Sequence, residues 1–525
     1  MREIRLPKPT GEYAVGTFTY TVRDVRKEVM QQGGMRSVAA RVYYPVLKES
    51  VKDLPKAVAL SDNMLKGFRD AFKVAPNFKK NPEANRSECY AGAERIAGAK
   101  FPLILFNHGY NSYRESNSFL CIDLASHGYV VICVNHSHEA LCTEFDDGTV
   151  LFFDQTLAKR MYEPKLGGLI AMLKLTKEKG SDEELAEKFD AAQRKYCRFL
   201  MDRLPEWVKD NEAALAYAKK NLSDLIDFEK GVGVSGHSMG GNAAYALCAR
   251  NDDFVCGINI DGGLFGDYTG DDLKKPFMQI SCKDNENVVN RVYLKHTKPI
   301  YKAFFKDMKH IGFSDAKHFI PVKAVVGKLD ADVMHENLCR CHLDFFDAYL
   351  KKNKDAPALK SNEYVRISVY ESIELRPVKR EDVETVWRMQ VEAFSDLLKK
   401  YEDYDTSPAA EGMDKVLARF EQPWTTYYFI LVNDEKAGVI RVADKKDGSR
   451  KRISPIWIMP EYRNKGYATQ AILAVEEKYG SDNWCLDTIL QEKGNLHLYE
   501  KLGYHQTGRI EKINDRMDIV FYEKG

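Results

Sequence analysis

A serine between glycines is the first group in this sequence with the setting of a nucleophile. Ser238 lies in the run GVGVSGHSMGG, residues 231–241, where a short apolar segment meets the small residues of GNAAYALCA. Gly236 and Gly240 allow a sharp strand-to-helix turn that exposes the serine hydroxyl. The sequence therefore predicts a nucleophile elbow, which needs a base, an orienting carboxylate and an oxyanion hole.

A second stretch has the composition of a phosphate-binding turn. RNKGYA, residues 463–468, follows the strand-like SPIWIMPEY and precedes the helix-like TQAILAVEEKYG. Gly466 and Ala468 leave room for a diphosphate beside the first amides of the helix, and Arg463 and Lys465 add positive charge. A glycine-containing turn before a helix is a weak signal alone, so its context must decide.

Two clusters contain the residue types of metal ligands. His335, Cys339 and His342 are spaced to share one helical face, and HSHE at residues 136–139 holds two histidines in alternation. Neither cluster has a fourth ligand at a recognisable distance. We expect packing or loop roles for both and no metal cofactor.

The order of apolar runs indicates the scaffold that positions these groups. Runs ending in turn residues alternate with helical periodicity: FPLILFNHG, YVVICVNH, KGVGVSGHS, VCGINIDGG and PFMQISCKD. This alternation is typical of an α/β fold with a mostly parallel sheet covered on both faces. Residues 158–230 have a long, charged, helical pattern, so we expect a cap insertion there. A change in composition divides the chain into a first domain, residues 1–365, and a smaller α+β domain, residues 366–525.

Bulk composition limits the classes of function. The 525 residues include 78 Lys and Arg against 77 Asp and Glu, a formal charge of +1, which attracts neither nucleic acid nor anionic membranes. No secretory signal is visible, the apolar runs are shorter than a membrane span, and the 11 cysteines are scattered. We expect a soluble cytoplasmic protein with small-molecule ester and amine substrates, no nucleic-acid partner and no stable membrane insertion.

The first domain resembles a known family of esterases. Its motifs occur in the same order as in the plasma-type platelet-activating-factor acetylhydrolases, over about residues 5–350: LPKPTGEYAVGTFTY, FPLILFNHG, IDLASHGYVV, GHSMGG, INIDGG and HIGFSD. The resemblance implies an α/β-hydrolase fold. It also implies a Ser-Asp-His triad acting on carboxylic esters, typically short or oxidised acyl groups of phospholipids.

Carried over position by position, the resemblance gives each triad role a residue. It implies Ser238 as the nucleophile, Asp261 in INIDGG as the acid and His310 in HIGFSD as the base. The order serine, aspartate, histidine is also the order expected of α/β-hydrolases in general. Asp284, which follows the next strand, and His318 remain alternatives for the acid and the base.

The oxyanion hole is expected to use two backbone amides. One belongs to Met239, directly after the serine, and the other to Tyr110 in the loop NHGYNS, to which the family match points. We expect His108 in the same loop to shape the loop.

The second domain resembles the GNAT N-acetyltransferase superfamily over about residues 372–525. RNKGYA fits the pattern R/Q-x-x-G-x-G/A, and NLHLYEKLGYHQTG resembles the terminal helix and following strand. The resemblance implies acetyl-CoA as co-substrate and Tyr499 as the acid that protonates the departing thiolate. Glu492 departs from the family, because many members have asparagine there; Asn495 lies nearby. The implied acetyl-CoA contacts are Ile458, Arg463, Asn464, Lys465, Gly466, Tyr467 and Ala468.

Together the two halves predict a bifunctional protein: a serine esterase for short-chain acyl or acetyl esters, phospholipid-like or soluble, and an acetyl-CoA-dependent N-acetyltransferase. In the alternative, the hydrolase domain acts as an esterase or acyltransferase and the second domain senses acetyl-CoA or binds a partner without turnover. Because acetyl-CoA is an intracellular metabolite, the second domain supports a cytoplasmic location. Amine specificity is expected in variable segments such as SDLLKKYEDYDTSPAAEG, where Glu402, Asp403 and Asp405 are more consistent with a solvated loop than with a cation site.

Overall fold

The computed structural model divides the chain into two compact units, Met1–Tyr370 and Glu371–Gly525. It describes residues 6–28, 34–73, 75–76, 78, 81–161, 166–271, 273–294, 296–354 and 356–525. We expected the boundary near residue 365. It falls after β13 (Val365–Tyr370), because this strand pairs antiparallel with β12 (Ile300–Phe305) and so completes the sheet of the first unit.

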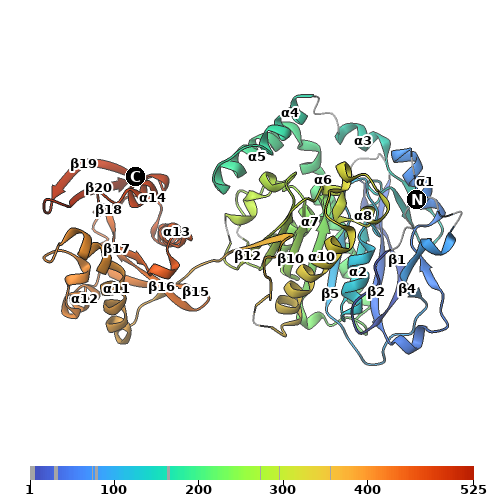
Figure 1. The fold of residues 1–525 in the computed structure, drawn as a ribbon, viewed down its shortest axis with the longest axis horizontal. Helices are drawn as coiled ribbons and strands as arrows, with labels where there is room; N and C mark the ends of the chain where they lie inside the picture. The colour runs from blue at the N-terminus through green and yellow to red at the C-terminus, as the bar shows by residue number, and fades with distance from the viewer. Residues whose placement is uncertain are drawn as a thin grey trace. The chain divides into compact units, whose positions relative to one another are not determined.

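The first unit is built on a large, mostly parallel sheet (Figure 1). All residues of its central strands β5 and β6 are buried, as expected for strands covered on both faces. From β6 through β5 and β9 to β12, each strand lies parallel to its neighbours, whereas β2 pairs antiparallel with both β6 and β1. In the described residues the strand order is β13-β12-β11-β10-β9-β5-β6-β2-β1-β4-β3, with further bounds β1 (Ala14–Lys27), β2 (Met35–Val46), β3 (Lys56–Val58), β4 (Arg86–Ala91), β5 (Leu103–Asn107), β6 (Val130–Asn135), β9 (Val232–His237), β10 (Phe254–Ile260) and β11 (Phe277–Ser281).

Helices cover both faces of this sheet. α6 (Arg198–Asn221) and α7 (Met239–Arg250) share one apolar core with the strands, whereas α2 (Ser118–Ser126) and α10 (Ala331–Phe346) share the other. The small residues of α7 fit this position, since most of the helix is buried. Outside these layers lie α1 (Asp62–Phe72), α8 (Ala316–Phe319), α9 (Lys323–Val326) and a short hairpin of β7 (Cys142–Glu144) and β8 (Val150–Phe152).

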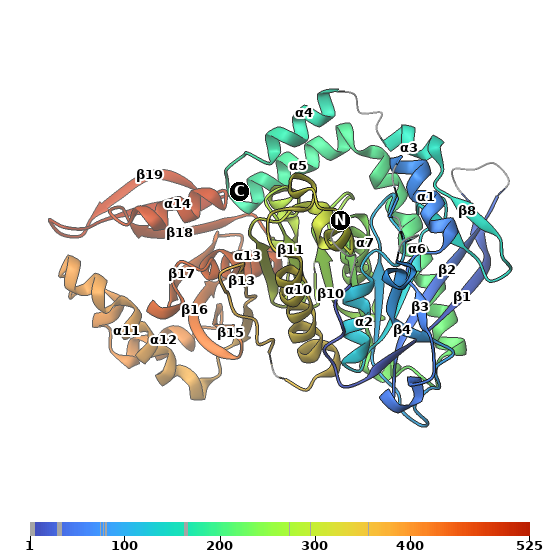
Figure 2. The ribbon, with the colours of Figure 1, turned by 45° about the vertical axis from the view of Figure 1, so that its right-hand side comes forward.

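The cap expected over residues 158–230 differs in extent from the sequence prediction. It begins earlier, with α3 (Gln155–Met161), and continues through α4 (Leu166–Leu175) and α5 (Asp182–Tyr196), which lie next to each other at the rim of the first unit (Figures 1 and 2). α6 is not a cap helix along its whole length, because Ala214, Leu215 and Ala218 are buried in the sheet core. The insertion is therefore continuous with the covering layer of the sheet.

The second unit holds a mostly antiparallel sheet between two pairs of helices. α11 (Val383–Tyr401) and α12 (Met413–Phe420) pack on one face, and α13 (Tyr467–Tyr479) and α14 (Lys493–Lys501) on the other. The described strands run in the order β14 (Glu374–Pro377), β15 (Thr425–Val432), β16 (Glu435–Ala443), β17 (Lys451–Ile458), β18 (Trp484–Ile489), β20 (Asp518–Lys524) and β19 (His505–Lys512).

One strand pair in this sheet separates soon after it begins. β17 and β18 run parallel but pair only at Lys451–Trp484 and Arg452–Cys485, although both strands continue beyond those residues. The sheet is therefore open between these two strands. Among the described helices of the whole chain, none has both the length and the apolar content that a membrane span requires.

Candidate active sites

Ser238 lies at the sharp turn between β9 and α7. Its backbone has φ 59° and ψ −123°, a conformation that non-glycine residues rarely adopt. A Cβ on Gly236 would lie 2.4 Å from the carbonyl carbon of Gly240, and a Cβ on Gly240 would lie 2.3 Å from the carbonyl oxygen of Asn107. The turn therefore requires glycine at both positions, as the sequence pattern predicted.

Three predicted residues from the segments that follow β9, β10 and β12 meet at this turn. The Nε2 atom of His310 lies 2.9 Å from the hydroxyl oxygen of Ser238, and its Nδ1 atom lies 2.8 Å from Oδ2 of Asp261. Asp261 follows β10 and is fully buried, whereas the side chain of His310 is 31% exposed. With the proton on Nδ1, the imidazole donates to the carboxylate and accepts from the serine hydroxyl. This arrangement can remove the hydroxyl proton as Ser238 attacks a carbonyl carbon.

The two alternative residues lie elsewhere. Asp284 pairs with the ammonium group of Lys309 at 2.6 Å. The ring of His318 packs edge-on against Phe119, with 5.8 Å between ring centroids. Neither contacts Ser238 in the described residues, because the loop after β11 points Asp284 at Lys309 and His318 belongs to α8.

Two further side chains hold the histidine, and the sequence did not single them out. His237 donates a hydrogen bond from Nε2 to the carbonyl oxygen of His310 at 2.9 Å. Burial, together with the nearby His310, lowers the pKa of His237 to about 3, so it stays neutral near pH 7. Asn285 donates from Nδ2 to Oδ2 of Asp261 at 3.0 Å and lies 3.0 Å from Nδ1 of His310. Asn285 follows β11 without a motif of its own, so only the folded chain identifies it.

The loop expected to complete an oxyanion hole runs beside the elbow. A Cβ on Gly109 would lie 3.0 Å from the Cβ of Ser238, so the backbone here approaches closely. Tyr110 follows directly, and its ring packs edge-on against Phe153, which precedes α3, and Phe199 of α6. Met239 begins α7, where the first amides of a helix have no partner within the helix. The two predicted amides therefore belong to two backbone segments that both adjoin Ser238.

Buried polar residues hydrogen-bond to the loop NHGYNS and hold it in place. His108 is fully buried, with Nδ1 2.6 Å from the carbonyl oxygen of Gly109, as expected of a loop-shaping histidine. His136 lies with Nε2 3.0 Å from Oδ1 of Asn107 and Nδ1 2.9 Å from Oδ2 of Asp210. Asp210 belongs to α6, and the next residue of this helix, Asn211, donates from Nδ2 to Oδ1 of Asn107 at 2.7 Å, so α6 is joined to the loop both through His136 and directly.

A buried ionic cluster continues from Asp210. Arg36 pairs with Asp210 at 2.6 Å and with Glu28 at 2.6 Å, and Arg203 pairs with Glu139 at 2.7 Å. Burial opposes ionisation of Asp210, but Arg36 outweighs it and holds the pKa of the carboxyl well below its usual range. Glu139 is the last residue of HSHE and His136 the first, so both ends of this motif contribute side chains to the ionic cluster.

The other histidine cluster also has protein partners. His342 lies with Nε2 3.1 Å from the hydroxyl of Ser235 in β9, whereas His335 lies 3.7 Å from the sulfur of Cys339. His342 thus points at the sheet and the other two side chains contact each other. Within the described part of the chain, no group of three or more histidine, cysteine or acidic side chains has the arrangement of a metal site.

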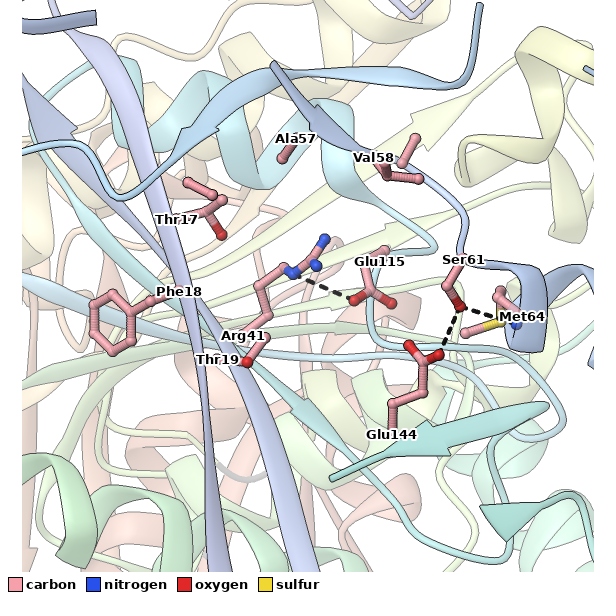
Figure 3. Close-up of a pocket in the computed structure, with 12 residues that line it drawn as sticks. Thr17, Phe18, Thr19, Arg41, Ala57, Val58, Ser61, Met64, Glu115 and Glu144 are labelled. Atoms are coloured by element: carbon pink, nitrogen blue, oxygen red, sulfur yellow. Dashed lines mark hydrogen bonds and ion pairs between the residues drawn. The ribbon is translucent and has the colours of Figure 1, made fainter. Parts of the chain in front are cut away.

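A cavity of about 300 Å³ lies near the edge of the first sheet that is formed by β1, β4 and β3, and Ser238, Asp261 and His310 do not line it. Figure 3 shows Arg41 directed at Glu115, and Ser61 directed at Glu144. The nitrogen of Arg41 is 3.4 Å from the Glu115 carboxylate, and the hydroxyl of Ser61 donates to Glu144 at 2.8 Å. Arg41 and Glu115 of the lining are thus paired with each other, whereas Glu144 accepts a hydrogen bond from the neutral Ser61.

The second unit has a larger cavity where β17 and β18 separate. Its volume is about 580 Å³, and both strands contribute to its wall. Tyr499 of α14 lines it and is almost fully buried. Burial, followed by the charge of Asp487, raises the pKa of Tyr499, which therefore holds its proton near pH 7. A protonated phenol beside an open strand pair is suited to donate a proton to a leaving group.

The contacts of Glu492, which stands where many GNAT proteins have asparagine, show the direction in which its side chain points. Its carboxylate accepts hydrogen bonds from the Tyr401 hydroxyl and the Lys400 ammonium, both at 2.6 Å, so it faces α11. Asn495 instead lines the cavity, where its amide donates to Thr488 of β18 at 3.2 Å. Asn495 is therefore the asparagine that lies at the open strand pair.

The predicted phosphate-binding turn lies at the start of α13. Gly466 has φ 82°, and open space surrounds the position of a Cβ there. The guanidinium of Arg463 donates to the carbonyl oxygens of Ile458, at 3.2 Å, and Ala393, at 2.7 Å. Tyr467 is buried with its hydroxyl on Glu371. Of the predicted contacts, the exposed Asn464, Lys465 and Gly466 lie in the turn itself, Ala468 is half-buried in the first turn of α13, and half-buried Ile458 ends β17.

Comparison with known proteins assigns a family model to each unit. The model described as platelet-activating factor acetylhydrolase, isoform II, matches residues 1–332, and that of the acetyltransferase (GNAT) family matches residues 387–504. Platelet-activating factor acetylhydrolase of Cavia porcellus is 23% identical over 366 residues, covering 67% of this chain and 79% of the relative. Spermidine N(1)-acetyltransferase of Escherichia coli (strain K12) is 26% identical over 143 residues, covering 26% of this chain and 76% of the relative.

A solved structure shows the same fold for the first unit. Ferulic acid esterase from Streptomyces cinnamoneus covers 70% of this chain and 99% of its own, with a TM-score of 0.53 and 20% sequence identity. At that identity the likeness shows the fold alone.

Proposed function

Because the chain belongs to the platelet-activating factor acetylhydrolase, isoform II, family and carries a GNAT domain after it, we propose that it joins two enzymes in one polypeptide. The first hydrolyses short-chain carboxylic esters with Ser238, Asp261 and His310. The observation that carries this proposal is the continuous set of contacts from the strained Ser238 through His310 to Asp261.

The hydrolysis proceeds in two balanced steps. His310 takes the hydroxyl proton as Ser238 bonds to the acyl carbon, and the same proton then passes to the departing alcohol as its C–O bond breaks. Water next gives a proton to His310 while its oxygen bonds to the acyl carbon. Release of the acid returns that proton to Ser238. Asp261 stabilises the imidazolium, and the amides of Met239 and Tyr110 stabilise the negative oxygen.

Short acyl esters of glycerophospholipids and soluble acetyl esters are the proposed substrates. A related fungal protein, from Arthroderma benhamiae, is named probable 1-alkyl-2-acetylglycerophosphocholine esterase and is 22% identical over 399 residues. We propose a cytoplasmic location, because the second unit would use acetyl-CoA, which is an intracellular metabolite.

A p-nitrophenyl ester series from acetyl to octanoyl tests the esterase. Ser238→Ala and His310→Gln should each lower kcat by roughly a thousandfold or more, because each removes a reacting group. His318→Gln, which replaces the other histidine considered, is the matched control and should keep the rate within about twofold. Unchanged hydrolysis by Ser238→Ala would refute the esterase proposal.

The second unit is proposed to transfer an acetyl group to an amine. The open turn at Gly466 and the first amides of α13 fit a diphosphate, since they combine a close backbone approach with the positive end of a helix. Bound acetyl-CoA would supply the thioester. Tyr499 is proposed to give its proton to the sulfur as the amine nitrogen bonds to the acyl carbon and the C–S bond breaks. The proton that the nitrogen loses passes to water, and Tyr499 regains a proton from water.

Release of free CoA thiol tests the transferase. With acetyl-CoA and a broad panel of amines, the full chain should release CoA in step with N-acetylated product, and Tyr499→Phe should lower kcat by about a hundredfold or more. Tyr504→Phe, also in this core but bonded to Glu476 at 2.8 Å, is the control. Binding of acetyl-CoA without thiol release from any amine would favour a sensing domain instead.

A further inference from the structure

Charged side chains line the cavity between β17 and β18, and most but not all of its arginines form ion pairs. Four arginines line it, and three of them form ion pairs with acidic residues of the same cavity: Arg419 with Glu411, Arg452 with Asp487 and Arg509 with Glu511. Within the described residues, the fourth, Arg441, has no carboxylate in ion-pair range. One arginine of the cavity lining therefore has no ion-pair partner of its own among the described residues.

Every acceptor that Arg441 contacts is uncharged. Nη1 donates to the carbonyl oxygen of Ser454 at 2.7 Å, and Nη2 donates to the side chains of Gln422 and Thr425, both at 3.2 Å. Nε is buried and makes no hydrogen bond to the described residues. The guanidinium carbon lies 5.8 Å from the ring centroid of Tyr427. The side chain is thus held in place while donor capacity is left over.

Its position favours contact with a bound molecule. Arg441 lies on β16 opposite an irregularity in β17, between Ile453 and Ile456, and this part of β17 has no partner on β18. Burial lowers the pKa of Arg441, and the charges of Arg419 and Arg452 lower it further, whereas Tyr427 and, more weakly, Glu411 oppose the change. A cation in such a setting is stabilised when an anion comes to it.

We propose that the amine acetylated in this cavity also carries an anionic group, a carboxylate or a phosphate, which Arg441 binds. This inference rests on the proposed N-acetyltransferase function and names its substrate class. Arginine presents a planar set of donors that suits both kinds of oxygen anion. Arg441 is therefore a specificity-determining residue for the acceptor.

The acidic residues of the cavity do not offer an equivalent site for a polycation. Asp403 is the cavity acid without an ion pair in the described residues, and its two oxygens accept hydrogen bonds from the amide and hydroxyl of Thr406, at 2.9 and 2.6 Å. Glu402 pairs with Arg516 at 2.8 Å outside the cavity lining. A polyamine would have to displace existing ion pairs, whereas an anion would gain an unpaired arginine.

Matched amines on the full-length protein test the proposal through CoA release. The pairs are glycine with glycinamide, 4-aminobutyrate with 1,4-diaminobutane, and ethanolamine phosphate with ethanolamine. We expect the anionic member of at least one pair to have a kcat/KM about tenfold or more above its partner. The carboxylate and phosphate pairs distinguish the two sources of anion.

Substitution of Arg441 assigns the preference to this residue. Arg441→Gln should raise KM for the anionic amine and reduce the preference to about threefold or less, without changing KM for acetyl-CoA. Arg441→Lys should keep part of the preference. Arg509→Gln, an exposed cavity arginine paired with Glu511, is the control and should keep the preference.

Two results would overturn the inference. One is the absence of a preference for the anionic member in every pair; the other is an equal effect of Arg441→Gln on both members. Either result leaves the N-acetyltransferase function standing, because CoA is still released. Failure of every amine to release CoA would instead contradict that function and the inference with it.

Discussion

Replacement of Asp261 by asparagine removes the negative charge from the proposed triad but leaves a side chain of nearly the same size. Oδ1 of Asp261 accepts the amide of Cys282 at 2.8 Å, and Oδ2 faces Nδ1 of His310 at 2.8 Å and Asn285 at 3.0 Å. An asparagine side chain has a single acceptor oxygen, so it can accept hydrogen bonds either from Cys282 or from the His310 side, but not from both. With its oxygen on Cys282, its amide group points at His310.

The expected loss follows from the tautomer of the histidine. An amide donor facing Nδ1 forces that nitrogen to accept, so the proton moves to Nε2, which can then no longer take the proton of Ser238. Such a change lowers kcat by about ten-thousandfold, which is about 5.4 kcal/mol of barrier height. Asp284→Asn changes a carboxylate whose ion-pair partner, among the described residues, is Lys309. It should therefore leave kcat within about twofold.

Initial rates with p-nitrophenyl acetate, measured on both variants and the wild type, check this reasoning. Circular dichroism and thermal unfolding show whether each variant is folded. If folded Asp261→Asn keeps a rate within tenfold of wild type, or Asp284→Asn loses as much as Asp261→Asn, the assignment of the acid is refuted.

Three other predictions concern stability and cofactor binding. The pKa of His237 in the folded protein, about 3, lies below the usual value of about 6.5. Its contribution to stability is therefore fully present above pH 6.5 and is lost as the pH falls towards 3. Between pH 7 and pH 5, the free energy of unfolding of His237→Gln should decrease by about 2 kcal/mol less than that of the wild type, as measured by urea unfolding at both pH values. A similar decline in both proteins would contradict this. Glu139→Gln leaves the buried Arg203 without its main partner and should cost about 3–5 kcal/mol in the same assay; a loss below 1 kcal/mol would show that the cluster is dispensable. Gly466→Ala, at φ 82°, should lower the free energy of unfolding by about 1–2 kcal/mol and raise KM for acetyl-CoA. Gly494→Ala, with open space around it and no positive φ, should do neither. Equal effects of the two substitutions would argue against the turn as the cofactor site.

The sequence predicted most reliably what local patterns determine. Continuous apolar runs became the buried central strands β5 and β6, and the glycines around Ser238 became the turn that needs them. The assignment to an α/β-hydrolase followed by a GNAT domain is confirmed by the matching family models and, for the first unit, by the fold of a solved esterase.

Features that depend on distant contacts were harder to predict. The segment at β13 looked like the start of a new domain, but its partner β12 lies some sixty residues earlier. Asn285 and Asp210 contact predicted residues only after the chain folds, and nothing in their local sequence sets them apart. The pairing of cavity arginines, and hence the unpaired Arg441, likewise requires the three-dimensional arrangement.

Covalent labelling tests the central claim, that Ser238 is the nucleophile of an esterase, most directly. The full-length protein is treated with a fluorophosphonate, and the adduct is located by peptide mass spectrometry in wild type, Ser238→Ala and, as a control, Ser235→Ala. The account predicts one adduct, on Ser238, formed in parallel with loss of ester hydrolysis and absent from Ser238→Ala. An adduct on another residue that accompanies inactivation, or full activity with Ser238 labelled, would contradict it.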